Sequence, residues 1–272
     1  HGLDVDWERE VLVTSGATEA LADSFLALLD TGDEAIVIEP AYDAYSPLIR
    51  RAGGTVVPVQ LHAPDWALTR EALQAAITPR TRLIVLNTPM NPIGKVFSEA
   101  ELDSLEEAVL AHDLVIVSDE VYEHLVFDGA RHTTPFSRPA IRDRVVRIGS
   151  AGKTFSVTGW KVGTVTADPK LLGPISRAHQ FVTFTTPPAL QAAVAAGLHF
   201  ADSYYDGLKR SLETRRDLLL GALRREGFTV ADAPATYFAL ADVSGIDADS
   251  DDLLFCERIT REAGVAAVPL SS

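Results

Sequence analysis

Short apolar runs rich in β-branched residues alternate along the chain with segments of helical spacing. The apolar runs are VLVTSG, AIVIEP, TVVPVQ, RLIVLNTP, LVIVSDEVY, VVRIGS and KVGTVTAD. Helical spacing is found between them, over residues 17–29, 70–77, 98–112 and 169–179. Strands that read as continuous apolar stretches are buried on both faces. The alternation therefore predicts an α/β fold with a mainly parallel central sheet covered by helices.

The pattern changes after about residue 200. A long charged amphipathic segment, YYDGLKRSLETRRDLLLGALRREG, precedes three short apolar runs, FTVADAP, TYFALADV and GVAAVPL, which we interpret as strands around one more helix. Residues 1–200 are predicted to form a large domain, and residues 201–272 part of a smaller α+β C-terminal domain that is incomplete. Both ends of the sequence lie close to an apolar run, so we expect a fragment of a longer chain.

Charge and cysteine content exclude several classes of partner. The chain has 38 acidic against 24 basic residues among 272, with a pI near 4.9. Such a surface repels nucleic-acid backbones and anionic lipid heads, so neither nucleic acid nor membrane is an expected partner. The single cysteine, Cys256, excludes an internal disulfide and a cysteine-based metal cluster. We expect a core thiol on a helix, no metal, and a reducing, cytoplasmic compartment.

Polar, glycine-bearing or aromatic residues follow five of the apolar runs, in TSGATEA, EPAYDAY, NTPMNPIG, SDEVYEH and SAGK. Ligands of open α/β sheets bind beyond the carboxyl ends of the strands, so these motifs predict one shared site. The turn at Ala17 and Thr18 offers unpaired N–H groups to an anion, although a helix cap explains it as well. Equally, Asp119 reads as a turn carboxylate, Asn91 as a turn residue and Tyr42 as a core aromatic.

Two lysines stand in SAGKTFSVTGWKVG, residues 150–163, among small, hydroxyl-bearing and aromatic residues. Lys153 would be partly desolvated, which favours the neutral amine that attacks carbonyl groups. Lys161 opens a strand, where its charge completes an anion site with Ser150. Either lysine alone also fits a solvated surface position. Together with an acid for a ring nitrogen, a tyrosine and an asparagine for a phenolic oxygen and a stacking aromatic, they match what pyridoxal 5'-phosphate (PLP) demands.

With these motifs in this order, the sequence resembles the class I aminotransferases of the aspartate-aminotransferase fold, which is PLP-dependent fold type I. The resembling branch contains kynurenine, glutamine, methionine and succinyldiaminopimelate aminotransferases. The motifs that carry the resemblance are TSGATEAL, EPAYDAYSP, NTPMNPIGKVF, SDEVYEHLVF, SAGKTFSVTGWKVG, HQFVTF, ATYF and GVAAVPLS. The resemblance implies a homodimeric aminotransferase that moves an amino group between an L-amino acid and a 2-oxo acid by a ping-pong mechanism.

The resemblance also implies a role for each candidate residue. Lys153 forms the internal aldimine with PLP and, once freed, serves as general base and acid. Asp119 pairs with the pyridine nitrogen, and Tyr122 with Asn91 hydrogen-bonds the phenolic oxygen. Tyr42 takes the place of the stacking aromatic. The positions around the phosphate are those of Ala17, Thr18, Ser150 and Lys161.

Three positions depart from the residue that is common in the family. Lys161 stands where many relatives carry arginine, as in the kynurenine-like branch. Ala235 replaces a glycine and is expected to narrow the substrate side of the pocket, whereas Ile93 replaces threonine or serine and is expected to be harmless. The family's arginine for the substrate carboxylate lies downstream of VPLSS, and its pocket-closing segment lies upstream of His1. The sequence therefore leaves the amino donor and the acceptor open.

Alternative functions remain open at this point. A PLP-dependent cysteine-conjugate β-lyase forms the same carbanion but eliminates a group from the β-carbon. A non-catalytic PLP-binding sensor domain would be joined to a basic helix-turn-helix segment, which is not visible here. A third possibility is an inactive fragment that does not close its site. His124 and His179 are interpreted as structural.

Overall fold

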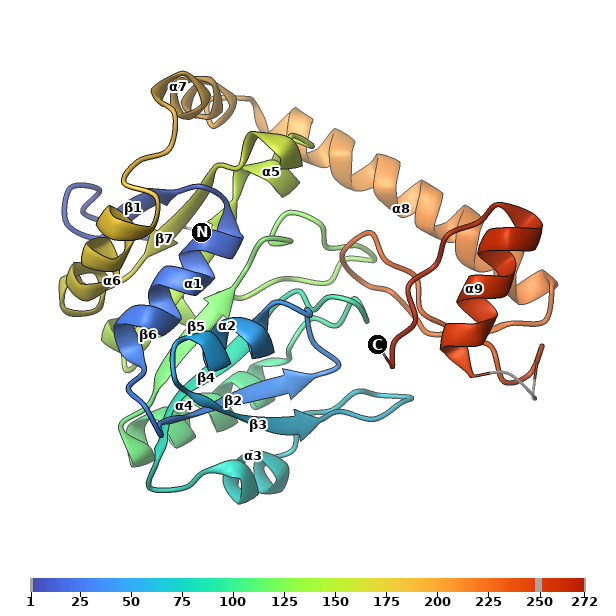
Figure 1. Ribbon diagram of the computed structural model, residues 1–272. Helices are drawn as coiled ribbons and strands as arrows, with labels where there is room; N and C mark the ends of the chain where they lie inside the picture. The colour runs from blue at the N-terminus through green and yellow to red at the C-terminus, as the bar shows by residue number, and fades with distance from the viewer. Residues whose placement is uncertain (1, 248–250, 272) are drawn as a thin grey trace.

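The computed structural model describes residues 2–247 and 251–271, and a seven-stranded sheet organises the larger part of them (Figure 1). Its strand order is β1-β7-β6-β5-β4-β2-β3, and β7 pairs antiparallel with both of its neighbours while the other pairs are parallel. Six strands therefore run in one direction, which confirms the predicted mainly parallel sheet. The strands are β1 (Val11–Thr14), β2 (Glu34–Glu39), β3 (Thr55–Gln60), β4 (Thr81–Asn87), β5 (Val115–Asp119), β6 (Val145–Ser150) and β7 (Gly163–Thr166).

Helices cover both faces of this sheet, and each face has its own buried apolar cluster. On one face α1 (Ala17–Leu28), α2 (Tyr45–Arg51) and α6 (Pro169–Val182) contribute to a cluster with strand residues such as Val85 and Val117. On the other face α3 (Arg70–Ala76) and α4 (Glu99–His112) pack over Ile84 and Ile116. Burial on both faces explains why the strands read as continuous apolar runs.

Two of the helices that cover the sheet, α4 and α6, begin at capping signals in their sequence. The hydroxyl of Ser98 accepts from the N–H of Glu101 while the Glu101 carboxylate accepts from the N–H of Ser98, a capping box that starts α4. The Asp168 carboxylate caps α6, whose first residue is proline. By contrast, α2 and α5 (Ala151–Thr154) were not predicted, because seven and four residues are too few to show a period.

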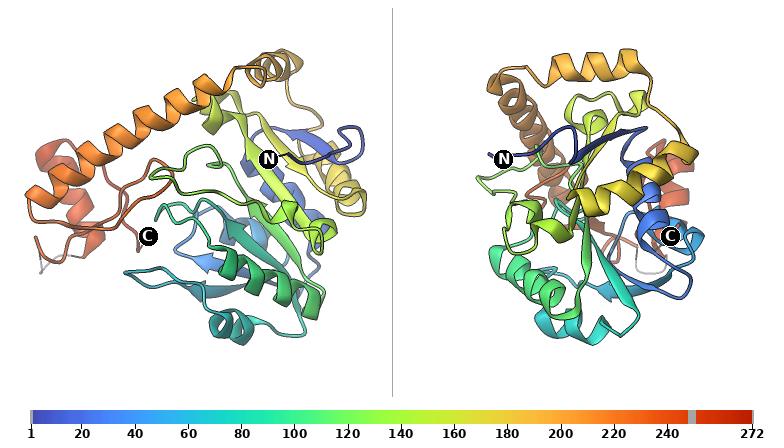
Figure 2. Two further views of the ribbon diagram at one scale, coloured as in Figure 1. Left: turned by 180° about the vertical axis from the view of Figure 1, so that it is seen from behind. Right: turned by 90° about the vertical axis from the view of Figure 1, so that its left-hand side faces the viewer.

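The C-terminal part is built differently, from long helices and very short strands (Figures 1 and 2). After α7 (Pro188–Gly197), the 24-residue α8 (Asp202–Arg225) extends away from the sheet toward α9 (Asp252–Ala263). Between these two helices, β8 (Thr229–Val230) and β9 (Ala241–Asp242) pair antiparallel. The boundary at residue 200 stays a prediction. Cys256 is buried on α9, as expected.

The strand predicted at GVAAVPL is wrong. The described residues after Ala263 form no strand, and Val265 and Val268 are 56% and 88% exposed. A strand needs a neighbour for its N–H and C=O groups, and the two-residue strands β8 and β9 pair only with each other in this part of the described chain. An apolar run without an available sheet edge stays irregular.

Across residues 2–247 and 251–271, none of the helices is both long enough and apolar enough to cross a lipid bilayer.

Candidate active site

All nine residues that the sequence singled out line one cavity of about 220 Å³. The cavity lies at the carboxyl ends of five strands, β1, β2, β4, β5 and β6, and at the start of β7, which runs the other way. Parallel strands bring their exits to one edge, so motifs up to about 145 positions apart in sequence meet here. The nine are Ala17, Thr18, Tyr42, Asn91, Asp119, Tyr122, Ser150, Lys153 and Lys161.

Asp119 is the last residue of β5 and is 4% exposed. The hydroxyl of Tyr45 donates to its Oδ2 at 2.6 Å, and the N–H of Val121 donates to its Oδ1 at 3.3 Å. Burial raises the pKa of Asp119 to about 6, although both hydrogen bonds act in the opposite direction. Because both donors are neutral, a cationic or proton-bearing ligand in the cavity would stabilise this carboxylate.

Tyr45 is a site residue that the sequence analysis missed. It is the first residue of α2 and is 1% exposed, and burial together with the nearby Asp119 carboxylate raises its pKa well above the usual range. The rings of Tyr42 and Tyr45 meet edge to face with centroids 5.6 Å apart. The i, i+3 spacing in EPAYDAY was the available signal, since it places both rings on one side of a helical turn.

Lys153, on the short helix α5, is half-buried. Its Nζ donates to the Tyr237 hydroxyl at 2.8 Å and lies 5.7 Å from the centre of the Tyr122 ring. The Tyr122 hydroxyl donates to that of Tyr237 at 3.4 Å. Burial, followed by the Tyr237 hydrogen bond, raises the pKa of Tyr122. The amine is thus held between the Tyr237 hydroxyl and the ring of Tyr122.

Tyr237 was also missed as a site residue, although its motif, ATYF, was noted. Its neighbour Phe238 lines the cavity and packs edge to face on Tyr122, with centroids 6.0 Å apart. Ala235, expected to narrow the pocket, is not among the residues that line it. It is fully buried and bridges Val126, and a Cβ on Gly94 would lie 2.7 Å from its carbonyl oxygen. That expectation is therefore wrong: Ala235 packs against backbone.

The turn between β1 and α1 forms a positively charged corner of the cavity. Gly16, with φ of 83°, precedes α1, and the first residues of that helix, Ala17 and Thr18, line the cavity. A Cβ at Gly16 would lie 3.1 Å from Cε and 3.3 Å from Nζ of Lys161. The ammonium group of Lys161 therefore lies beside the helix N-terminus. Unpaired N–H groups, the helix dipole and a lysine charge together suit a phosphate.

Asn87 connects two predicted residues and was not predicted itself. Its side-chain nitrogen donates to the carbonyl oxygen of Asp119 at 3.0 Å, and its side-chain oxygen accepts from the N–H of Asn91 at 2.6 Å. It thereby ties the NTPMNPIG segment to the end of β5. Nothing local in the sequence distinguishes this role from an ordinary strand end.

Comparison with known proteins agrees with this site. The family model "Aminotransferase class I and II" matches residues 1–272. A probable N-succinyldiaminopimelate aminotransferase of Mycobacterium tuberculosis is 43% identical over 274 residues, which cover all of this chain and 68% of the relative. The methionine aminotransferase of Escherichia coli is 38% identical, over all of this chain and 70% of the relative.

Solved structures agree as well. The structure of N-succinyldiaminopimelate aminotransferase from Mycobacterium tuberculosis superposes with a TM-score of 0.96 at 42% identity, over 99% of this chain and 71% of that one. The chain belongs to the class I and II aminotransferase family, with the fold type I architecture that the sequence predicted. It is an aminotransferase, and its reaction is the transfer of an amino group.

Proposed function

We propose that this aminotransferase depends on PLP and moves an amino group between an L-amino acid and a 2-oxo acid in a ping-pong reaction. The observation that carries the proposal is one cavity lined by a half-buried lysine, a buried carboxylate and a cationic helix N-terminus, contributed by Lys153, Asp119 and the corner at Lys161. These three features match the aldehyde, the pyridine nitrogen and the phosphate of PLP.

The remaining lining residues fit the rest of the cofactor. The phosphate would be held by Ala17, Thr18, Ser150 and Lys161. Tyr42 would stack on the ring, and Tyr122 and Asn91 would hydrogen-bond its phenolic oxygen. The close approach of Lys161 to Gly16 supports the phosphate position, because any side chain at Gly16 would displace the lysine.

When bound, PLP accepts the electron pair that the substrate α-carbon keeps after losing its proton. Asp119 would hold a proton at the pyridine nitrogen, which also relieves the cost of burying its carboxylate. Lys153 would bind the cofactor covalently and then carry the proton at its Nζ. Tyr237 positions that Nζ by the 2.8 Å hydrogen bond and keeps it at the cavity wall.

Borohydride reduction after incubation with PLP, followed by peptide mass mapping, tests the assignment. We expect one pyridoxylated lysine, Lys153, and no label on the exposed Lys170. The Lys153→Ala variant should lose the label and keep its circular dichroism spectrum. Label spread over surface lysines would contradict the proposal.

Substrate choice is the finer part of the proposal. N-succinyldiaminopimelate and methionine are the first amino donors to test, because relatives at 43% and 38% identity are named for them. The relatives reported above are named as aminotransferases, so neither the β-lyase nor the sensor alternative gains support. Formation of pyruvate and ammonia from a cysteine conjugate would instead support the β-lyase alternative.

We also propose that the enzyme is a homodimer in the cytoplasm. Large apolar side chains of α6 and of the segments flanking α7 are exposed, with Phe181 at 85%, Phe184 at 72% and Leu198 at 64%. Such a patch suits a second copy of the chain. Light scattering should give twice the mass of one chain, and Phe181→Asp should lower it. A monomer at all concentrations would contradict the dimer, and cell fractionation tests the compartment.

A further inference from the structure

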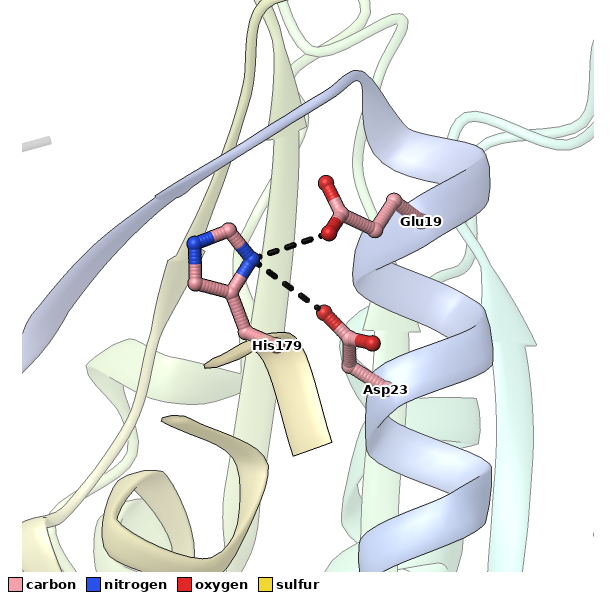
Figure 3. Close-up of side chains that lie close together, drawn as sticks. All are labelled: Glu19, Asp23 and His179. Carbon is pink, nitrogen blue, oxygen red and sulfur yellow. Dashed lines mark hydrogen bonds and ion pairs between the residues drawn. The ribbon is translucent and has the colours of Figure 1, made fainter. Parts of the chain in front are cut away.

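Outside the cavity, a second group of buried polar side chains lies between α1 and α6 (Figure 3). Glu19 and Asp23 are one turn apart on α1, and both face His179 of α6. The exposed fractions of Glu19, Asp23 and His179 are 8%, 0% and 7%. Nδ1 of His179 lies 2.9 Å from Oε1 of Glu19 and 3.6 Å from Oδ2 of Asp23.

Asp23 has no hydrogen-bond donor within the described chain. Neither of its carboxylate oxygens accepts a hydrogen bond, and both are shielded from solvent. Nδ1 of His179 carries at most one hydrogen, which the shorter contact directs to Glu19. Burial, followed by repulsion from Glu19, raises the pKa of Asp23 to about 7. A fully buried carboxylate without a donor is unfavourable, so a missing partner needs an explanation.

We propose that Glu19, Asp23 and His179 bind a divalent transition-metal ion, Zn²⁺ in the first instance, through one oxygen of each carboxylate and Nδ1. Three donors at the usual Zn²⁺ distances of about 2.0–2.2 Å in a tetrahedron are about 3.3 Å apart. The two measured separations, 2.9 and 3.6 Å, lie on either side of that value, and all three donor atoms lie within 4.8 Å of one another.

The donor set also selects the kind of metal. An imidazole with two carboxylates suits Zn²⁺ and its neighbours in the first transition row, whereas Mg²⁺ and Ca²⁺ prefer oxygen ligands alone. Metal binding requires Nδ1 without its hydrogen, so the ion replaces the hydrogen bond between His179 and Glu19. The ion gives Asp23 a directly bound positive partner, whereas the protein offers only the imidazole of His179 at 3.6 Å.

A metal here would join α1 to α6 one turn below Ala17 and Thr18. The second oxygen of Glu19 already accepts from the N–H of Ser15, which precedes the anion-binding turn. The ion would therefore stabilise the wall of the cavity without contacting the reacting groups. This structural role agrees with the interpretation of His179 from the sequence, although no metal was expected there.

Metal uptake by the untagged, PLP-saturated protein tests the proposal. The protein is treated with a chelator, dialysed against ZnCl₂ or CoCl₂ and analysed by elemental analysis, Co²⁺ absorption and thermal unfolding. We expect one tightly bound ion per chain, visible Co²⁺ bands from nitrogen and oxygen ligands, and a higher melting temperature with Zn²⁺. A folded wild-type protein that takes up no ion would show that the three side chains share only protons, and would overturn the proposal.

Matched variants locate the ion. Asp23→Asn keeps the shape of the side chain and should weaken Zn²⁺ binding by more than about 10-fold, because even outer partners of metal ligands contribute about 10–100-fold. His179→Gln should do the same. His199→Gln removes an exposed histidine and should leave binding unchanged. Unchanged affinity in Asp23→Asn, with its fold verified by circular dichroism, would contradict the site.

Discussion

Two aspartates, Asp119 at the end of β5 and Asp23 on α1, are almost completely buried, yet their surroundings differ. Asp119 accepts hydrogen bonds from Tyr45 and Val121 and borders the cavity. Asp23 accepts none from the described residues and lies between two packed helices. Burial raises the pKa of both carboxyl groups, to about 6 for Asp119 and about 7 for Asp23.

The difference indicates which kind of ligand fits beside each carboxylate. A carboxylate at the end of a strand opens onto space large enough for an organic cofactor, which then supplies the proton or the positive charge. Asp23 is fully buried between α1 and α6 with Nδ1 of His179 3.6 Å away, which suits a small ion or a proton. Buried charge thus points to a ligand in both places, and the surrounding packing determines its size.

The largest effect on activity is expected from Lys153→Ala, which changes the cavity and leaves the cluster around Asp23 intact. This change removes the covalent anchor and the proton carrier of the cavity, so kcat should fall by at least about 10⁴-fold. Steady-state kinetics measures the loss. Lys170→Ala, an exposed change on α6, is the control and should keep its activity. Ordinary turnover by Lys153→Ala would disprove the site.

Asp119→Asn comes next. A neutral amide cannot hold the proton at the cofactor ring, so kcat should fall by about 10²–10³-fold while PLP still binds. Kinetics and spectroscopic titration with PLP separate the two effects. The exposed Asp206→Asn on α8 should behave like the wild type. An unchanged kcat in Asp119→Asn would show that the carboxylate is not needed to hold the proton at the cofactor ring.

The pH dependence of stability tests the burial of Asp119 directly in the PLP-free protein. Its pKa in the folded protein, about 6, lies above the usual aspartate value of 3.8, so its contribution to stability is complete below pH 3.8 and is lost as pH rises through 6. Between pH 4 and pH 8, Asp119→Asn should gain on the order of 2–3 kcal/mol relative to wild type. Urea unfolding at several pH values measures the difference, and parallel curves for the two proteins would contradict it.

Of the four predicted effects, that of Gly163→Ala on the protein should be the smallest. A Cβ there would lie 2.6 Å from the backbone carbon of Gly16, so β7 and the anion-binding turn would have to move apart. We expect a loss of about 1–3 kcal/mol in the free energy of unfolding and weaker PLP binding. Gly159→Ala is the control, because a Cβ at Gly159 meets nothing within 4 Å. Equal stability of both variants would argue against the close contact.

The large sheet was readable from sequence because its central strands contain unbroken apolar runs, as in Leu83–Leu86, that are buried on both faces. Of the three C-terminal runs predicted as strands, FTVADAP and TYFALADV do contain strands, but each strand is only two residues long, Thr229–Val230 and Ala241–Asp242. Whether an apolar run becomes a strand depends on a neighbour elsewhere in the chain, which local periodicity does not contain.

The nine site residues could be named from sequence because motifs such as SAGK and SDEVY stand at strand exits, where polar residues are unusual. Tyr45, Asn87 and Tyr237 were missed because each acts through another residue: Tyr45 through Asp119, Asn87 through Asn91, and Tyr237 through Lys153. Contacts of this kind join positions that are up to 84 residues apart, except for the local contact of Asn87 with Asn91.

By itself, the sequence determined the class of fold, the order of the strands along the chain and the chemical types gathered at their ends, because burial and turn chemistry are local properties. Only the tertiary structure decided which side chains touch. It brought Tyr237 to Lys153 and Tyr45 to Asp119, and it left Asp23 beside His179 without a donor. Those outcomes depend on how helices pack over the sheet, and packing is a property of the whole chain.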